Sequence, residues 1–248
     1  MTTALRTEWI KVRRLPLPRY LLLTVIIAAV GSAVAALGAD GQSPDGIPER
    51  AGLGLLVAGI FGTAAFAVWM FAVEVSQGTL SRAFCVEPRR SRVILAKAVL
   101  ATVLPIVVVA VLGLVTLPIT VAAVNSHGGD STMADFAPNI PAAVVQIALV
   151  APACFGLGLI TGSMTGGIVA SLLMIEILPG ILAVSGLADA SLIIALSSLA
   201  TQISDGQAPV LTGSQIAVSP LTALLVLAAW SGAMLALGLA RVRSTDIV

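Results

Sequence analysis

Charged residues are scarce in this sequence: Asp, Glu, Lys and Arg make up only 10% of its 248 residues, while 58% are apolar and the mean hydropathy is +1.07. A soluble domain has about 25% charged residues, which cover the surface that faces water. Cysteine and histidine are also scarce, since the chain has only Cys85, Cys154 and His127. None of the three has a second Cys or His nearby, which excludes a disulfide framework and a zinc site. We therefore expect a membrane protein without a metal site.

A phosphate-binding loop is missing as well. No GxxxxGK[ST] pattern occurs, and the glycine-rich run at 165–167 is not followed by the lysine that would reach a nucleotide. The apolar runs contain no nucleophile or metal constellation, so an intramembrane enzyme is not expected. The 13 basic and 12 acidic residues give a net charge of +1, which argues against nucleic acid as a partner. This chain is thus expected to be no enzyme and to carry no cofactor of its own.

Long apolar runs are what the sequence does contain. A helix rises about 1.5 Å per residue, so about 20 apolar residues cross a hydrocarbon core of about 30 Å. Six runs have about that length, at residues 20–38, 52–73, 98–124, 141–163, 166–187 and 219–240. They lack the alternation of β-barrel strands, so the sequence predicts an all-α membrane protein, a single transmembrane domain over 1–248 with six transmembrane helices.

The first run has two possible interpretations. Five basic residues precede it and Ala33-Val34-Ala35 resembles a cleavage site, as in a secretory signal peptide. Its apolar core, residues 20–38, is longer than the about 7 to 15 residues usual in a signal peptide, and five more runs follow. We therefore expect an uncleaved helix.

The basic residues predict the orientation. Twelve of the 13 lie before the first run, between the second and third runs, or after the sixth, and only Arg50 falls on the other side. By the positive-inside rule, both termini then face the cytoplasm. Residues 39–51 and 125–140 become external turns. The apolar stretch at 191–203 is too short to span and is predicted as a short external helix before the last run.

The segment before the first run has the pattern of an amphipathic helix on the inner leaflet. Leu5, Trp9 and Val12 form one stripe at i, i+4 and i+7. The candidate interfacial residues are Glu8, Trp9, Lys11, Arg13 and Arg14. The same cations would serve equally well as a topology signal with no further role, and the periodicity does not separate the two alternatives.

Residues 74–97 form the only substantial internal loop, with two acidic and five basic residues. A glutamate ends one run, Gly-Thr follows four and five residues later, and Pro-Arg-Arg and a lysine precede the next run. This order resembles the six-helix permease subunits of ABC-2 type transporters, as do the opening TEWIKVRR and the last run SPLTALLVLAAW. The matching residues of the loop are Glu74, Gly78, Thr79, Pro88, Arg89, Arg90 and Lys97.

The resemblance implies an exporter subunit in the plasma membrane that forms half of a translocation path. A second copy or a paralogous permease would complete the path, and a separate soluble ATPase would bind ATP and Mg²⁺. In the family, a short coupling helix in the second-to-third loop docks on the ATPase, which assigns that role to residues 75–90. The candidate coupling residues are Glu74, Gly78, Thr79, Arg82, Pro88, Arg89 and Arg90. Alternatively, these cations only enforce topology.

Glu176 is the one ionisable residue inside an apolar run, near the middle of 166–187. An ionised carboxylate at the bilayer centre costs at least about 2.5 kcal/mol, so we expect Glu176 to be protonated, paired or facing a cavity. It is the candidate residue of the substrate path. The alternative function is a self-contained secondary transporter that uses Glu176 for proton or cation coupling. A neutral carboxyl group that is hydrogen-bonded to a neighbouring helix is the plainer interpretation.

Glycines and prolines inside the runs bear on helix packing. Gly158, Gly162 and Gly166 recur at every fourth position, and small residues at this spacing let helices approach closely. We expect them to pack within the chain rather than between subunits. Prolines 105, 118, 152 and 179 are expected to bend the helices that contain them.

Overall fold

All secondary structure in the described part of the chain is helical. The computed structural model describes residues 46–78, 90–126, 128, 130, 132–136, 139–177 and 220–244, and single positions at 6, 9, 10, 23, 26, 27, 30 and 31. The helices are α3 (Gly46–Ser76), α5 (Arg90–Ser126), α6 (Met133–Phe136), α7 (Asn139–Thr161), α8 (Met164–Leu172), the π-helix η1 (Leu173–Ile177) and α12 (Pro220–Ser244).

Three helical segments are long and apolar enough to cross a membrane. They are Ser91–Ser126, Ala143–Thr161 and Leu224–Val242, and the shorter segments Gly59–Val75 and Met164–Ile175 are also apolar. These are the features of a helical membrane protein, so the predicted class is confirmed for the described residues. That the chain has six spans, and that both termini face the cytoplasm, remain predictions. Most of the first run and all of 191–203 lie outside the described residues.

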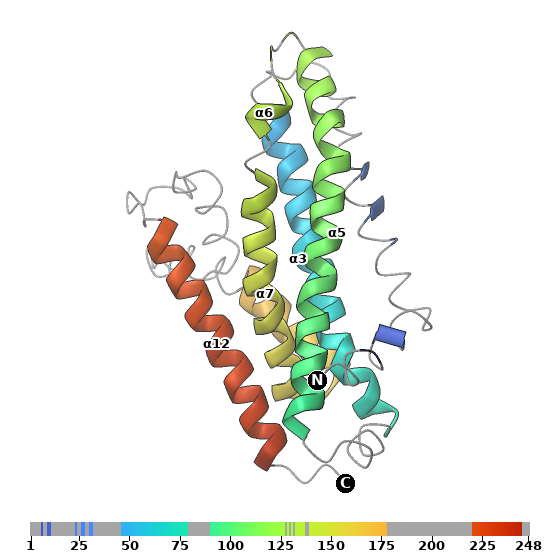
Figure 1. Cartoon of the computed structure of the whole chain (residues 1–248), viewed down its shortest axis with the longest axis vertical. Helices are drawn as coiled ribbons and strands as arrows, with labels where there is room; N and C mark the ends of the chain where they lie inside the picture. Colours follow the sequence, from blue (N-terminus) through green and yellow to red (C-terminus); the bar gives the residue numbers. More distant parts are fainter. Residues whose placement is uncertain are drawn as a thin grey trace.

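The long helices alternate in direction. Helices α3, α7 and α12 begin at the upper end of the bundle and α5 begins at the lower end (Figure 1). At the lower end, α3, α7 and α12 reach Ser76, Thr161 and Ser244, and α5 starts at Arg90. These are the directions that the predicted topology requires of its second, third, fourth and sixth spans.

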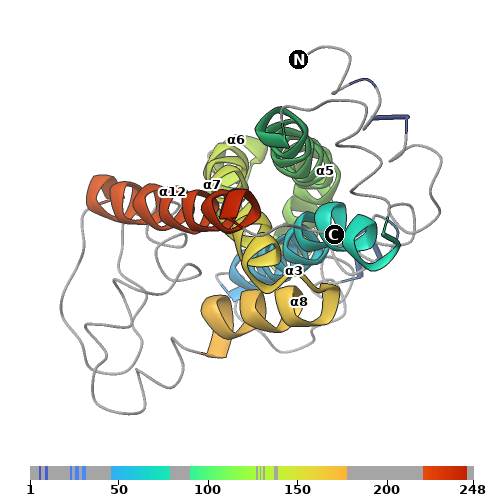
Figure 2. The same cartoon turned by 90° about the horizontal axis from the view of Figure 1, so that it is seen from below.

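Helix α7 occupies the centre of the bundle. It contacts α3, α5, α8 and α12, which surround it when the bundle is seen from below (Figure 2). Of the apolar span of α7, 61% is buried inside the bundle, whereas the corresponding share is 33% for α5 and 22% for α12. The core forms mainly between α3 and α7, where the rings of Phe71 and Phe155 meet edge to face at 6.4 Å.

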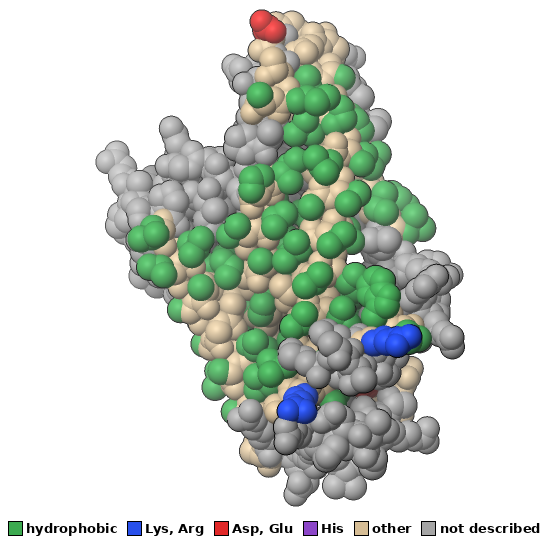
Figure 3. Space-filling model, in the orientation of Figure 1, with side chains coloured by type: hydrophobic (Ala, Val, Ile, Leu, Met, Phe, Trp, Pro, Cys, Tyr) green, Lys and Arg blue, Asp and Glu red, His purple; other side chains and the backbone are tan. Residues whose placement is uncertain are grey.

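The outer face of α5 carries a continuous apolar stripe. Every fourth residue from Leu95 to Val115 points outward, with side chains 38% to 53% exposed: Leu95, Val99, Val103, Val107, Val111 and Val115. Apolar side chains cover this face of the molecule over most of its height (Figure 3). Twenty helical steps rise about 30 Å, the thickness of a hydrocarbon core, so the stripe has the dimensions of a lipid-facing surface.

Backbones of α7 and α12 approach closely at two glycines. A Cβ atom at Gly156 would overlap the carbonyl of Met234, and one at Gly238 would lie 2.7 Å from Leu159 Cβ. The same helix pair is joined by the hydroxyl of Ser231, which donates to the carbonyl of Leu149. This contact comes from small residues that the spacing of glycines in the sequence does not single out.

The predicted glycine series divides into three different roles. Gly158 does pack within the chain, because a Cβ there would lie 3.3 Å from Val68 Cα. Gly162 forms the turn after α7 with φ 67°, a left-handed value that favours glycine. Gly166 lies in the first turn of α8, where its amide donates to the capping hydroxyl of Ser163. The close approach of α8 to α3 occurs instead at Gly167, whose Cβ would lie 2.5 Å from Val68 Cγ1.

Two helix boundaries differ from the prediction. Residues 46–50, predicted in an external turn, already belong to α3, and residues 90–97, predicted in the internal loop, form the first two turns of α5. Apolar runs underestimate helix length because polar side chains can occupy the terminal turns of a helix without breaking it. The loop predicted at 125–140 likewise contains the short helix α6. Prolines 105, 118 and 152 lie inside continuous α-helices, and Pro179 lies outside the described residues.

Candidate functional site

Helix α3 ends in a glycine turn at the start of the predicted coupling loop. The amide of Gly78 donates to the carbonyl of Val75 at 3.1 Å, and Gly78 has φ 61°. A left-handed residue after the last turn of a helix satisfies otherwise unpaired carbonyls, and glycine adopts it without steric cost. A Cβ atom at Gly78 would meet nothing within 4 Å, so its conformation and not close packing accounts for this glycine among the described residues.

A buried ion pair joins α3 to α5 just above this turn. The Nζ atom of Lys97 lies 2.8 Å from Oε1 of Glu74, and the two side chains are 1% and 9% exposed. Glu74 stands two residues before the end of α3 and Lys97 seven residues after the start of α5. The antiparallel direction of the two helices brings these residues together across the loop.

The surroundings of the ion pair are apolar. Phe71 and Ala72 precede Glu74 on α3, and Ile94 and Ala96 precede Lys97 on α5, and all four are at most 1% exposed. Water is therefore excluded from most of the pair, and the attraction between the charges is much less screened than at a surface. The apolar helical segments Gly59–Val75 and Ser91–Ser126 extend beyond the predicted runs, which is why they contain Glu74 and Lys97.

The other predicted coupling residues are placed only in part. Arg90 is the first residue of α5, and Thr79, Arg82, Pro88 and Arg89 lie outside the described residues. Lys and Arg side chains visible in Figure 3 lie toward the lower end of the bundle, and an acidic side chain stands at its upper tip. Whether residues 75–90 contact a partner stays a prediction.

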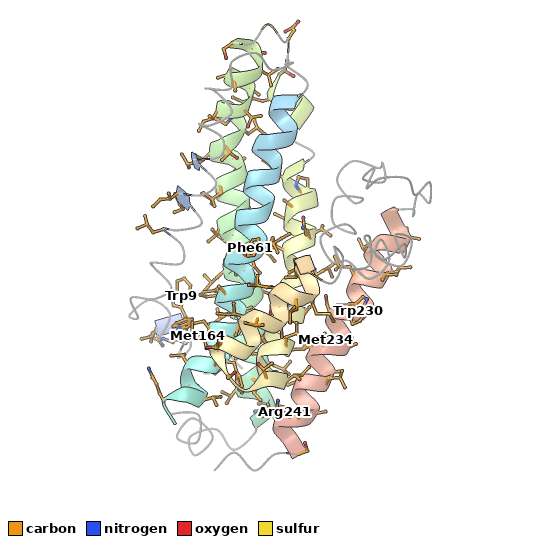
Figure 4. All side chains as sticks on the ribbon, turned by 180° about the vertical axis from the view of Figure 1, so that it is seen from behind. Trp9, Phe61, Met164, Trp230, Met234 and Arg241 are labelled. Atoms are coloured by element: carbon orange, nitrogen blue, oxygen red, sulfur yellow. The ribbon has the colours of Figure 1, made fainter. Side chains whose placement is uncertain are left out.

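The predicted interfacial helix is also described at single positions. Arg6, Trp9 and Ile10 are helical and exposed, and Trp9 stands at the side of the bundle (Figure 4). The side chains of Trp9 and Ile10 are 46% and 43% exposed. Glu8, Lys11, Arg13 and Arg14 lie outside the described residues.

Glu176 lies in the π-helix η1, which directly continues α8. Short π-helical turns inside α-helices are rare and are frequent at functional sites. Within this turn, the side chain of Ile175 is buried and 1% exposed, whereas that of Leu173 points outward and is 44% exposed. Sequence periodicity gave no sign of this irregular turn.

The sequence prediction also missed two buried polar groups, one on α3 and one on α7. Within the described part of the chain, the Thr63 hydroxyl and the Gln146 amide nitrogen have no hydrogen-bond partner, and both residues are 2% exposed. A polar group without a partner is costly in a membrane interior. Thr63 and Gln146 therefore mark the part of the core that is best suited to accept water or a polar group.

The lower end of α7 faces a cation. Arg241, at the lower end of α12 (Figure 4), places its guanidinium close to the turn at Gly162, where a Cβ atom would lie 4.0 Å from Nη2. A cation at a helix C-terminus compensates the negative end of the helix dipole. Arg241 therefore lies at the same end of the bundle as Arg90 and Arg92.

The described residues contain no group of three His, Cys, Asp or Glu side chains that could hold a metal ion. The free thiol of Cys154 is fully buried in α7. Comparison of the sequence with protein-family models and with curated proteins finds no match.

Proposed function

We propose that this chain is the membrane subunit of an ATP-driven exporter of the ABC-2 type, coupled to a separate ATPase through residues 75–90. The observation that carries the proposal is the joint between α3 and α5. A glycine turn and a buried ion pair hold two apolar helices at the ends of the one loop whose residues resemble the coupling loop of that family.

The geometry of this joint suits the transmission of movement. A partner that displaces residues 75–90 acts on α3 and α5 together, and both helices contact the central helix α7. Movement at the lower end would thus reach the core formed by α3 and α7, the helices that carry the buried Thr63 and Gln146. Two such subunits and two ATPases would complete the transporter, with ATP and Mg²⁺ bound on the ATPases.

The proposal predicts association with a soluble ATPase through the arginines of the loop. Replacement of Arg82, Arg89 and Arg90 together by Gln should weaken binding by about 1–3 kcal/mol, because charge pairs across an interface are lost. The measurement is the affinity of the purified chain in nanodiscs for the ATPase that co-purifies with it. The five cations before the first run preserve the bias that directs insertion.

Arg241→Gln is the matched control, because it removes an exposed arginine from the same end of the bundle but from α12. Its affinity should equal that of the unmodified chain. Transport by the purified chain in liposomes, driven by an ion gradient with no ATPase present, would contradict the proposed function.

Orientation gives a second test. Cys85 should react with a membrane-impermeant thiol reagent only when the cytoplasmic side is accessible, whereas a Cys introduced by Ser131→Cys should react from outside. Cys154 is fully buried, so Cys85→Ala should abolish labelling of the otherwise unmodified chain. Labelling of Cys85 in intact cells would overturn the predicted topology.

A self-contained secondary transporter is the second candidate function, and the π-helical turn around Glu176 is what favours it. Glu176→Gln keeps the size and hydrogen-bonding capacity of the side chain but removes its charge. If Glu176 carries a proton or cation, gradient-driven transport should fall at least about tenfold while the protein still folds. Unchanged transport across pH in this variant would eliminate the second candidate.

A further inference from the structure

The Glu74–Lys97 pair encloses the segment that the proposed function assigns to the ATPase. Residues 75 and 76 complete α3, residues 90–96 begin α5, and the 2.8 Å contact joins these two helices next to the ends that flank the segment. The pair therefore controls the distance and register between the two ends of the segment.

The depth of the pair in the bundle excludes water from it. On α5, Lys97 lies between Leu95 and Val99, the first two residues of the outward apolar stripe, but on the opposite, buried face. The Lys97 side chain is 1% exposed, so it lies inside the bundle and not in the aqueous loop. Its Nζ atom lies 2.8 Å from Oε1 of Glu74 on α3.

Stability alone does not explain an ion pair at this place. Desolvation of two charges offsets most of their attraction, and apolar side chains of similar size often stabilise a core equally well. The helix dipole adds to the cost, because Glu74 lies in the last turn of α3, where the dipole favours a cation. What an ion pair adds over an apolar contact is direction, since a short charge-assisted hydrogen bond fixes the relative position of its two ends.

We infer that Glu74 and Lys97 are positioning residues, whose buried ion pair holds the ends of α3 and α5 in one register and so fixes the relative position of the two ends of residues 75–90, the segment assigned to the ATPase. Neither side chain needs to touch the partner. The inference rests on the proposed function for the identity of that partner, while the clamp itself is a property of this chain.

Three variants in nanodiscs test the inference. The double variant Glu74→Met/Lys97→Met keeps the side-chain volume of the pair but removes the directional, charge-assisted hydrogen bond. The double variant Glu74→Lys/Lys97→Glu restores an ion pair in which the two charges have exchanged helices. Val103→Met, on the outward stripe of α5, is the control for a change of side chain on the same helix. For each variant we would measure amide exchange over residues 72–78 and 91–97 and affinity for the co-purifying ATPase.

The Met/Met variant should fold, but exchange at both helix ends should be at least about tenfold faster, since the ends open locally without the clamp. Its affinity for the ATPase should fall by about tenfold or more, because the segment then has to be ordered on binding. The swapped pair and Val103→Met should both lie within about threefold of the unmodified chain in both measurements.

Exchange and affinity in the Met/Met variant that equal those of the unmodified chain would overturn the inference. A folded swapped variant as defective as Met/Met would overturn it as well, because an ion pair of either sense should hold the ends. Failure of the proposed function gives a different result, in which the unmodified chain binds no ATPase. The exchange measurement alone then decides whether the clamp exists.

Discussion

Replacement of Lys97 alone by Met is expected to lower the free energy of unfolding by about 3–5 kcal/mol, the usual effect of removing one partner of a buried ion pair. The variant removes the ammonium group that faces Glu74 Oε1 and leaves a carboxylate in surroundings where Phe71, Ala72 and Ile94 are at most 1% exposed. The measurement is the unfolding midpoint in a denaturing-detergent titration of the purified protein.

The double Met variant gives the internal comparison for this loss. If the loss of stability in Lys97→Met arises from the charge left on Glu74, removal of both charges should recover most of the lost free energy of unfolding. Arg92→Met is the matched control, because Arg92 lies on the same part of α5 but is exposed, and it should change stability by no more than about 0.5 kcal/mol. Equal losses for Lys97→Met and Arg92→Met would contradict the burial of the pair.

Gly156→Leu is expected to separate α7 from α12 and to destabilise the fold by about 3 kcal/mol, at the upper end of overpacking effects. Even a Cβ atom at this position would overlap the carbonyl of Met234, which is backbone and cannot rotate away. The hydrogen bond from Ser231 to the carbonyl of Leu149 joins the same two helices and would be strained or lost with them. The same detergent titration measures the change.

Gly232→Leu is the control for this variant. Gly232 lies on α12, two residues before Met234, and a Cβ atom there would meet nothing within 4 Å. Its replacement should leave the unfolding midpoint nearly unchanged, because glycine is intrinsically unfavourable inside a helix and leucine is not. A comparable loss in both variants would show that the two backbones do not meet at Gly156.

Hydropathy predicted the helical class and most of the four runs at 52–73, 98–124, 141–163 and 219–240, because the need to satisfy backbone polar groups in lipid acts on about 20 consecutive residues at once. It could not predict that Lys97 is buried. A lysine beside an apolar run has the pattern of a loop residue, and only the antiparallel packing of α3 and α5 supplies the carboxylate that makes burial possible. For the same reason the start of α5 at Arg90 lies before the predicted boundary.

Glycine spacing had a similar limit. The repeat of Gly158, Gly162 and Gly166 is visible in the sequence, but a helix crossing is set by where two backbones meet in space. The tightest contacts between different helices therefore fall on Gly156, Gly167 and Gly238, which form no repeat with one another. The π-helical turn at Glu176 was equally hidden, since an extra residue in one turn leaves the composition of the run unchanged.

Helix α5 makes membrane thickness part of the energetics of this protein. Its 37 residues extend about 55 Å, whereas a hydrocarbon core is about 30 Å thick. Even a tilt of about 40°, the upper end of the usual range, leaves a projection of about 42 Å, which exceeds the hydrocarbon core and extends into the headgroup layers. A thinner or thicker bilayer changes the tilt and hence the position of Arg90. Lipid chain length is therefore expected to act on the joint between α3 and α5 without any ligand binding there.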